Sequence, residues 1–459
     1  MARRPNIVFI VADDLGYADL GCYGGRDAEF GKVSPVLDGL AANGLTFSQG
    51  YSNSPVCSPT RFALMTARYP YRLRGAAEEP INSQSRGSDT LGLPPAHPTL
   101  PSLLQGAGYR TALIGKWHLG YPPNFGPLKS GYETFFGPMS GGVDYFTHCD
   151  FRGSHDLWLG EAEHRQPGYL TDLITDRAVA WLGEVAPAAL AADSAADAPF
   201  FLSLHYTAPH WPWEARGDEA LAQQIKANLF HLHGGNIHRY RQMIHHMDEG
   251  IGRVMAAHSR RVWRATRWWS SPATTVASAF RITGRWWALV GGKMDLTEGG
   301  IRVPWIAHWP AVIAPGRIAG QTSAGRTSTQ HCLTMDWSAT MLAAAGVAAD
   351  PAYPLDGVSL LPLLHDPAAT FERPMAWRMK HRGQRAYRLG DWKYLQVDGH
   401  EYLFNLPADE RERANHAQRE PARLAALRQA WLDWDASMPS IAPDASVSLG
   451  YGVADMPQR

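Results

Sequence analysis

Pro55-Val56-Cys57-Ser58-Pro59-Thr60-Arg61 is the stretch around which the chain is organised. Ser58 is a good helix N-cap and Pro59 suits the first helical position, so we expect a helix to begin here. Cys57 then lies at a helix N-terminus, where free backbone N–H groups favour an anion. Arg61 adds a cation one turn further on. The stretch predicts an anion site with a nucleophile in it, although a buried cysteine before an ordinary helix fits these residues equally well.

The composition is that of a globular protein with a sizeable core. Of 459 residues, 45% are hydrophobic and 19% are charged, and the formal net charge is zero. This length predicts one large α/β domain plus a smaller one, or two to three domains. Without a net charge, nothing in the composition points to nucleic acid or to a membrane surface. The four cysteines, at positions 22, 57, 149 and 332, form neither a disulfide framework nor a zinc pattern.

The beginning of the chain and its hydropathy bear on location. Residues 1–5 run straight into a strand-like segment, without the apolar region and cleavage site of a signal peptide. No run is long and apolar enough to span a bilayer. We therefore expect a cytoplasmic protein with no membrane partner, unless a leader lies upstream of the assigned start.

Two adjacent carboxylates follow the first predicted strand. Asn6–Ala12 is a continuous apolar run, which is typical of a central parallel strand, and it ends in Asp13-Asp14. Ligands bind at the carboxyl ends of strands in open α/β sheets. Adjacent carboxylates there repel each other unless a cation lies between them, which indicates a hard divalent metal. A turn or a helix cap is the alternative, because Asp is common in both.

Cations and histidines follow two further predicted strands. Residues 109–114 lead into Lys116 and His118, which point the same way on an extended chain and suit an oxyanion substrate. Residues 199–204 lead into His210, which prolines hold in a rigid loop. The alternatives are a polar loop around a buried tryptophan in the first case and a structural histidine in the second. A third cation, Lys293, follows Gly291-Gly292 on a loop that we expect to be flexible.

The remaining elements follow from periodicity and from turn residues. His245 and Glu249 are four residues apart on one expected helix, but without a recognised zinc motif we expect a partly solvated helix surface. We expect helices over 34–44, 100–106, 169–185, 237–256, 334–345 and 421–436, loops over 75–98 and 186–198, and a C-terminal antiparallel meander with strands at 386–389, 392–397 and 401–406.

Several motifs together resemble the sulfatase family, over most of the chain and in the family's order. They are the strand ending in Asp13-Asp14, Cys-x-Pro-x-Arg at 57–61 with its continuation to Pro70, residues 115–120, Ala208-Pro209-His210, Gly292-Lys293 with residues 298–304, and Leu355-Asp356-Gly357. The resemblance implies the alkaline-phosphatase-like α/β fold, with a mostly parallel sheet sandwiched by helices. It also implies a catalytic domain over 1–369 and a small antiparallel subdomain over 370–459.

The resemblance also implies a mechanism. In this family a separate formylglycine-generating enzyme oxidises the cysteine to formylglycine (3-oxoalanine), and the hydrated aldehyde is the nucleophile. By resemblance, Asp13, Asp14 and the modified Cys57 bind Ca²⁺ or Mg²⁺, and Arg61, Lys116 and His118 hold and polarise the aldehyde. His210 and Lys293 contact the sulfate, with His210 as the acid toward the leaving oxygen. Cations and a metal neutralise a sulfate ester. The second hydroxyl of the hydrate, with His118 as a candidate base, allows sulfate to be expelled.

One stretch departs from the family. Sulfatases carry a strand ending in Asp-Asn-Gly before the Gly-Gly-Lys loop, and that Asp and Asn complete the metal site. Here residues 251–294 contain no Asp or Glu and many Arg and Trp. A basic, aromatic insertion that binds nucleic acid is one interpretation. We prefer another, because Ala265–Trp286 can be back-translated so that a shifted frame reads Asp-Thr-Leu-Val-Val-Phe-Thr-Ser-Asp-Asn-Gly-Gly.

Our hypothesis is a compensated pair of frameshifts, the first near Ala256–Ser259 and the second near Trp287–Leu289. If the printed sequence is what the cell makes, we expect the metal to lose two oxygen ligands and the sheet to lose a strand. We also expect residues 256–288 to pack poorly and the enzyme to be weak or inactive.

The sequence thus predicts an arylsulfatase-like sulfuric ester hydrolase that acts on a small-molecule or sugar sulfate ester and does not bind nucleic acid. A phosphoester or phosphonate hydrolase of the same superfamily is the close alternative, since the site would also suit a phosphoryl group. An inactive anion-binding homologue is the alternative from another class, because the Asp-Asn pair is missing.

Overall fold

The structure is a computed structural model. It describes residues 4–24, 31–73, 81, 85–190, 198–225, 235–257, 266–271, 289–313 and 326–441. Of residues 186–190, 225 and 266–271 it describes the backbone only.

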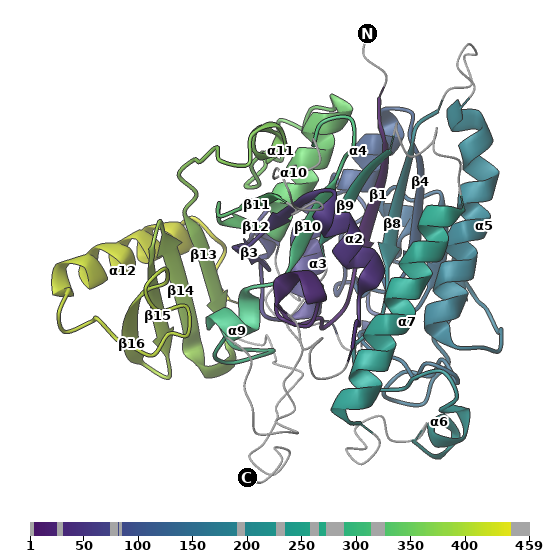
Figure 1. Ribbon diagram of the computed structural model, residues 1–459, viewed down its shortest axis with the longest axis horizontal. Helices are drawn as coiled ribbons and strands as arrows, with labels where there is room; N and C mark the ends of the chain where they lie inside the picture. Colours follow the sequence, from purple (N-terminus) through teal and green to yellow (C-terminus); the bar gives the residue numbers. More distant parts are fainter. Residues whose placement is uncertain are drawn as a thin grey trace.

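A ten-stranded mixed sheet forms the centre of the molecule (Figure 1), in the order β11-β2-β10-β9-β1-β8-β4-β5-β6-β7. The pairs β1/β8, β1/β9, β4/β8, β4/β5 and β2/β11 are parallel, and the other neighbours are antiparallel. Its strands are β1 (Asn6–Val11), β2 (Leu45–Phe47), β4 (Arg110–Gly115), β5 (Thr134–Gly137), β6 (Trp158–Leu159), β7 (Ala162–Glu163), β8 (Phe200–His205), β9 (Thr266–Ser271), β10 (Trp305–His308) and β11 (Arg326–Ser328). A separate parallel pair joins β3 (Gly50–Tyr51) to β12 (Cys332–Leu333).

Helices cover the sheet in two groups (Figure 1). The first group packs together as α2 (Pro35–Ala42), α5 (Leu170–Leu190) and α7 (Ile237–Ala256). The second group packs together as α3 (Cys57–Thr66), α4 (Leu100–Gly106) and α10 (Thr334–Ala345). Shorter helices are α6 (Glu219–Ile225), α9 (Glu298–Ile301) and α11 (Leu361–His365), with 3₁₀ turns at Gly21–Tyr23, Pro70–Arg72, Leu128–Ser130 and His381–Gly383. No described helix is both long and apolar enough to cross a membrane.

Three central strands bring their carboxyl ends to one edge of the sheet. All six residues of β1 are buried, because helices cover both faces, and this explains their continuous apolar sequence. The register pairs Val11 with His205 of β8, and His205 with Gly115 of β4. The residues that follow these strands include Asp13, Lys116 and His210, so the sheet itself delivers them to one place.

The expectation that the sheet loses a strand between α7 and the Lys293 loop is wrong. Thr266–Ser271 forms β9, which pairs in parallel with β1 and antiparallel with β10. The threonine and tryptophan residues of this stretch favour extended backbone, and the strand hydrogen bonds use only main-chain groups that any non-proline sequence supplies. The expectation that residues 256–288 pack poorly stays a prediction. Residues 258–265 and 272–288 lie outside the described residues, and of β9 only the backbone is described.

The C-terminal part forms a four-stranded antiparallel sheet with one helix on its face. The sheet was predicted, but its first strand, β13, was not. Its elements are β13 (Met375–Met379), β14 (Gln384–Leu389), β15 (Trp392–Val397), β16 (His400–Asn405) and α12 (Pro421–Ala436). One face packs on α12 through residues such as Leu427 and Trp431, and the other shares a core with Tyr51 and Leu296. A boundary at 369/370 stays a prediction.

Most predicted helices are confirmed, with two corrections at their ends. The helix after Val56 begins at Cys57, so Ser58 is not its N-cap. The Ser58 hydroxyl instead accepts a hydrogen bond from the backbone N–H of Ile81, at 2.8 Å. The expected loop at 186–198 is wrong over its first five residues, because α5 continues to Leu190 through an alanine-rich stretch that favours helix.

Candidate active site

The two carboxylates after β1 are buried and paired with lysines. Asp13 is 0% exposed and forms an ion pair with Lys116. Asp14 has a left-handed backbone, with φ of 62°, and its carboxylate accepts from Lys293 Nζ at 2.9 Å. Burial opposes the charged form of Asp13, but Lys116, Arg61, His210 and Lys293 outweigh it and hold the pKa of Asp13 well below its usual range. Asp13 is therefore an anion at neutral pH.

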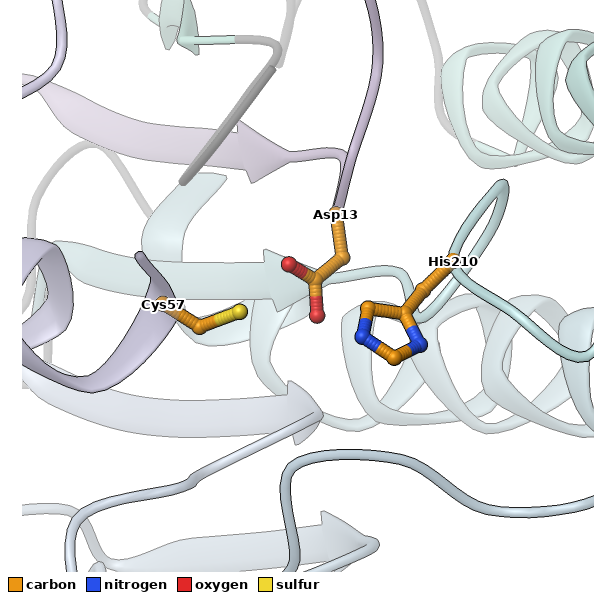
Figure 2. A group of neighbouring side chains, drawn as sticks. All are labelled: Asp13, Cys57 and His210. Atoms are coloured by element: carbon orange, nitrogen blue, oxygen red, sulfur yellow. The ribbon is translucent and has the colours of Figure 1, made fainter. Parts of the chain in front are cut away.

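Cys57 points into this cluster from the N-terminus of α3. Its sulfur, an Asp13 oxygen and a His210 nitrogen lie within 4.8 Å of one another, and Figure 2 shows the three side chains converging. Burial and Asp13 would raise the pKa of the thiol, but Lys116, Lys293 and a hydrogen bond with His210 lower it overall. Lys116 and Lys293 thus favour negative charge on residue 57.

Arg61 lies beneath the cysteine, fully buried. Its Nη1 donates to the carbonyl of Lys116 at 2.7 Å and lies 3.1 Å from His205 Nδ1, while Nη2 lies 3.6 Å from Asp13. Within the described ranges, Nε and Nη2 have no hydrogen-bond acceptor. A buried guanidinium with two nitrogens whose N–H groups are unused suits an oxygen-rich partner at the site.

His118 is buried nearby as a neutral imidazole. Its Nε2 contacts the carbonyl of Ile81, so this nitrogen carries the hydrogen, and Nδ1 has no partner among the described residues. Burial, and then Lys116, hold the pKa of His118 well below its usual range. The expected extended geometry is wrong, because His118 has φ of 60° where the chain turns off the sheet edge. Its free lone pair can accept a proton.

His210 and Lys293 form the other side of the cluster. His210 Nδ1 lies 2.5 Å from the carbonyl of Trp211, so it carries the hydrogen in the neutral ring. Nε2 lies 3.1 Å from Lys293 Nζ and 3.5 Å from Asp14. The expected flexible placement of Lys293 is wrong, because its side chain is 5% exposed and is held by these contacts.

The charges of the described cluster do not cancel. Three permanent cations, Arg61, Lys116 and Lys293, face two carboxylates. These five described side chains leave one excess positive charge in a buried site, which favours an anion there.

The two groups that the family resemblance implies, an oxidised residue 57 and a Ca²⁺ or Mg²⁺ ion, both fit the residues that the structure describes. The unused donors of Arg61 and the free Nδ1 of His118 suit a residue 57 that carries oxygens rather than sulfur. Asp13 and Asp14 are hard oxygen donors of the kind that Ca²⁺ and Mg²⁺ prefer, although two carboxylates supply only part of a coordination shell. The set of Asp13, Cys57 and His210 could also bind zinc, but Lys293 already occupies the lone pair of His210 Nε2.

Sequence reasoning missed several residues that support the site. The carbonyl of Gly141 accepts from Lys116 Nζ, and Tyr145 donates to the carbonyl of His210 at 3.0 Å. A Cβ on Gly142 would lie 3.0 Å from His210 and closer still to Phe151, so only glycine fits. In the sequence, the Gly141-Gly142 pair after β5 was the feature that could have indicated a close contact with the site. The expected solvated His245 is confirmed, since its side chain is 42% exposed and pairs with Glu249.

Comparison with known proteins gives consistent matches. The family described as Sulfatase matches residues 5–266, and the match ends inside the departing stretch 256–288. N-acetylgalactosamine-6-sulfatase of Canis lupus familiaris is 31% identical over 405 residues, covering 85% of this chain and 71% of that protein. Arylsulfatase A of Homo sapiens is 33% identical over 391 residues, covering 79% and 68%. The crystal structure of Ps i-CgsB in complex with k-i-k-neocarrahexaose has a TM-score of 0.78 and 28% identity, covering 95% of this chain and 94% of that one.

Proposed function

Because this chain belongs to the sulfatase family and is a sulfuric ester hydrolase, we propose that it cleaves sulfate esters of sugars, with Cys57 oxidised to formylglycine and a divalent cation held by Asp13 and Asp14. The observation that carries the mechanism is the convergence of Arg61, Lys116 and Lys293 on Asp13, which lies beside residue 57 at one buried sheet edge. Support for a sugar comes from N-acetylgalactosamine-6-sulfatase and from Ps i-CgsB with its bound oligosaccharide, which are similar to this chain.

Residue 57 and the cation supply the chemistry that the other side chains lack. As a hydrated aldehyde, residue 57 offers an oxygen nucleophile and a second hydroxyl that permits release of sulfate, and Ca²⁺ or Mg²⁺ adds positive charge beside it. Asp13 and Asp14 would hold the cation. The unused N–H groups of Arg61 orient the oxygens of residue 57, and His118 Nδ1 accepts a proton there.

In this proposal, Lys293 and His210 on the other side of the site contact the substrate. Lys293 Nζ binds a sulfate oxygen and neutralises the charge that develops on it. When its ring is protonated at both nitrogens, His210 can give the Nε2 proton to the leaving sugar oxygen, which lowers the barrier to its departure and returns the neutral ring with its hydrogen on Nδ1. The hydrogen bond from His210 Nδ1 to Trp211 fixes the ring so that Nε2 faces the reaction.

The test is an assay of matched esters. The protein is expressed with a formylglycine-generating enzyme, and 6-sulfated N-acetylgalactosamine, an aryl sulfate and the corresponding phosphate esters are compared. We expect hydrolysis of the sulfate esters, with the sugar preferred. Faster hydrolysis of the phosphate esters would favour a phosphoester hydrolase instead. Mass spectrometry of the Cys57 peptide completes the test, because an unmodified cysteine in active protein would refute the formylglycine mechanism.

A further inference from the structure

The turn that carries Lys293 has a strained backbone. Met294, the next residue, adopts φ of 76°, in the left-handed region that non-glycine residues rarely occupy. Such a conformation persists only where the surroundings hold it in place. The side chain of Met294 is buried against Val56 and Met379, and its N–H donates to the carbonyl of Pro55 at 3.1 Å. The turn therefore joins the Cys57 segment to the C-terminal sheet.

Gln384, at the start of β14 in the C-terminal sheet, forms hydrogen bonds with the backbone of this turn. Its side-chain oxygen accepts from the backbone N–H of Leu296 at 2.9 Å, and its nitrogen donates to the carbonyl of Met294 at 2.7 Å. The same nitrogen lies 3.1 Å from the carbonyl of His381. Gln384 is 1% exposed, so water does not compete for these hydrogen bonds.

The two backbone groups that Gln384 binds have no second partner among the described residues. Within the part of the chain that the structure describes, the carbonyl of Met294 and the N–H of Leu296 bond only to Gln384. The turn is also held by the hydrogen bond from Met294 to Pro55 and closed by hydrogen bonds between Gly292 and Asp295. Gln384 adds the two hydrogen bonds that tie Met294 and Leu296 to the C-terminal sheet.

We propose that Gln384 is a positioning residue that sets the place of the Lys293 ammonium in the active site. This rests on the proposed function, in which Lys293 binds the sulfate oxygen. The ammonium lies 2.9 Å from Asp14 and 3.1 Å from His210, so a shift of the turn by about 1 Å breaks both contacts. Through Gln384, the C-terminal sheet thus takes part in sulfate binding by holding the backbone of the turn that carries Lys293.

The test compares two glutamines with the same kind of environment. Gln384→Met keeps the length of the side chain but removes both hydrogen bonds. Gln330→Met is the matched control, because Gln330 is 4% exposed and also bridges two backbone groups, accepting from Phe371 at 3.0 Å and donating to His331 at 3.0 Å. Each change is made with and without Lys293→Ala. The readouts are kcat/KM for a sulfate ester, the Kd for inorganic sulfate by calorimetry, and the thermal midpoint.

We expect both glutamine variants to lower the thermal midpoint by similar amounts. Only Gln384→Met should lower kcat/KM, by about 10- to 100-fold, with a matching rise in the Kd for sulfate. In the Lys293→Ala background, Gln384→Met should change either constant by less than about twofold, because the group it positions is gone. Equal losses with and without Lys293, or equal losses from Gln384→Met and Gln330→Met, would overturn the inference. The wild-type protein could also fail to cleave any sulfate ester and still bind sulfate, with Gln384→Met weakening that binding only when Lys293 is present. This result would refute the proposed function but would support the positioning role of Gln384.

Discussion

Glu214 is a buried acid whose protonation should govern how stability depends on pH. It is 0% exposed, and its Oε2 accepts from the backbone N–H of Tyr145 at 2.8 Å. Burial, and then the neighbouring Asp144, raise the pKa of Glu214 to about 9. At neutral pH its carboxyl is therefore protonated and donates to Asp144. This pair links the loop that carries His210 to the Gly141-Gly142 loop.

The direction in which stability changes with pH follows from the linkage between proton binding and folding. The pKa of Glu214 is about 9 in the folded protein, against an ordinary value of 4.5. The folded state holds the proton more tightly, so the stability from this group is complete below pH 4.5 and is lost as pH rises toward 9. Between pH 6 and pH 9 the loss amounts to about 3 to 4 kcal/mol of unfolding free energy.

Glu214→Gln tests this directly. The amide oxygen can still accept from Tyr145, and the amide N–H replaces the carboxyl proton toward Asp144. Urea unfolding is measured at pH 6, 7.5 and 9 for the wild type, for Glu214→Gln and for Glu184→Gln, a control at an exposed position. We expect Glu214→Gln to reduce the loss of stability between pH 6 and pH 9, while the control follows the wild type. If all three proteins lose stability in parallel, the reasoning about Glu214 is wrong.

Four further predictions follow from the site and its supports. His118→Gln should lower kcat about 100-fold with little change in KM, because it removes the base but no contact to the sulfate; an unchanged kcat speaks against the role. Chelation should abolish activity, and Ca²⁺ or Mg²⁺ should restore it, with elemental analysis giving about one ion per chain; full activity without metal contradicts this. Lys393→Met should lower the unfolding free energy by about 3 to 5 kcal/mol, measured in urea, because Lys393 pairs with buried Glu298 at 3.0 Å and Glu412 at 2.8 Å; a near-neutral change refutes this. Resequencing the gene should reveal frameshifts at both ends of 256–288, and a nucleotide sequence incompatible with the shifted peptide ends that hypothesis.

The position of β9 adds a reason to resequence. In the shifted frame, the peptide Thr-Leu-Val-Val-Phe-Thr overlaps the codons of residues 266–272, where the structure has a strand. The parallel register places Ser271 beside Val11, so β9 ends at the same edge as β1. The Asp-Asn pair of the shifted peptide begins two codons beyond Ser271, which is how far Asp13 lies beyond Val11.

The sequence predicted those features that a short segment carries by itself. The apolar run of β1 indicated a buried strand, and Asp13, Lys116 and His210 were located because each follows such a strand. The meeting of Asp13, Lys116 and His210 followed from parallel topology, in which neighbouring strands end at a common edge, whereas the place of Cys57 beside them was implied only by the family resemblance.

Contacts between distant segments could not be predicted in this way. Gln384 reads as an ordinary polar residue at the start of a strand, and its role depends on a turn 90 residues earlier in the chain. The same holds for Lys393, whose burial between two glutamates no local pattern indicates. The strand β9 was expected to be lost because the family's strand ending in Asp-Asn-Gly is missing from the printed sequence, yet backbone pairing does not require that sequence.

The burial of Cys57 has a consequence for the timing of the oxidation that we propose for it. In the folded protein the residue is 2% exposed, so another enzyme can reach it only before the structure closes over it. Gln384, which joins the C-terminal sheet to the turn beside Pro55, leaves the ribosome 327 residues after Cys57. At about 5 to 20 residues per second, translation leaves about 15 to 65 seconds between the two. Under the proposed oxidation, we expect slower synthesis to raise the fraction of molecules that carry the modified residue.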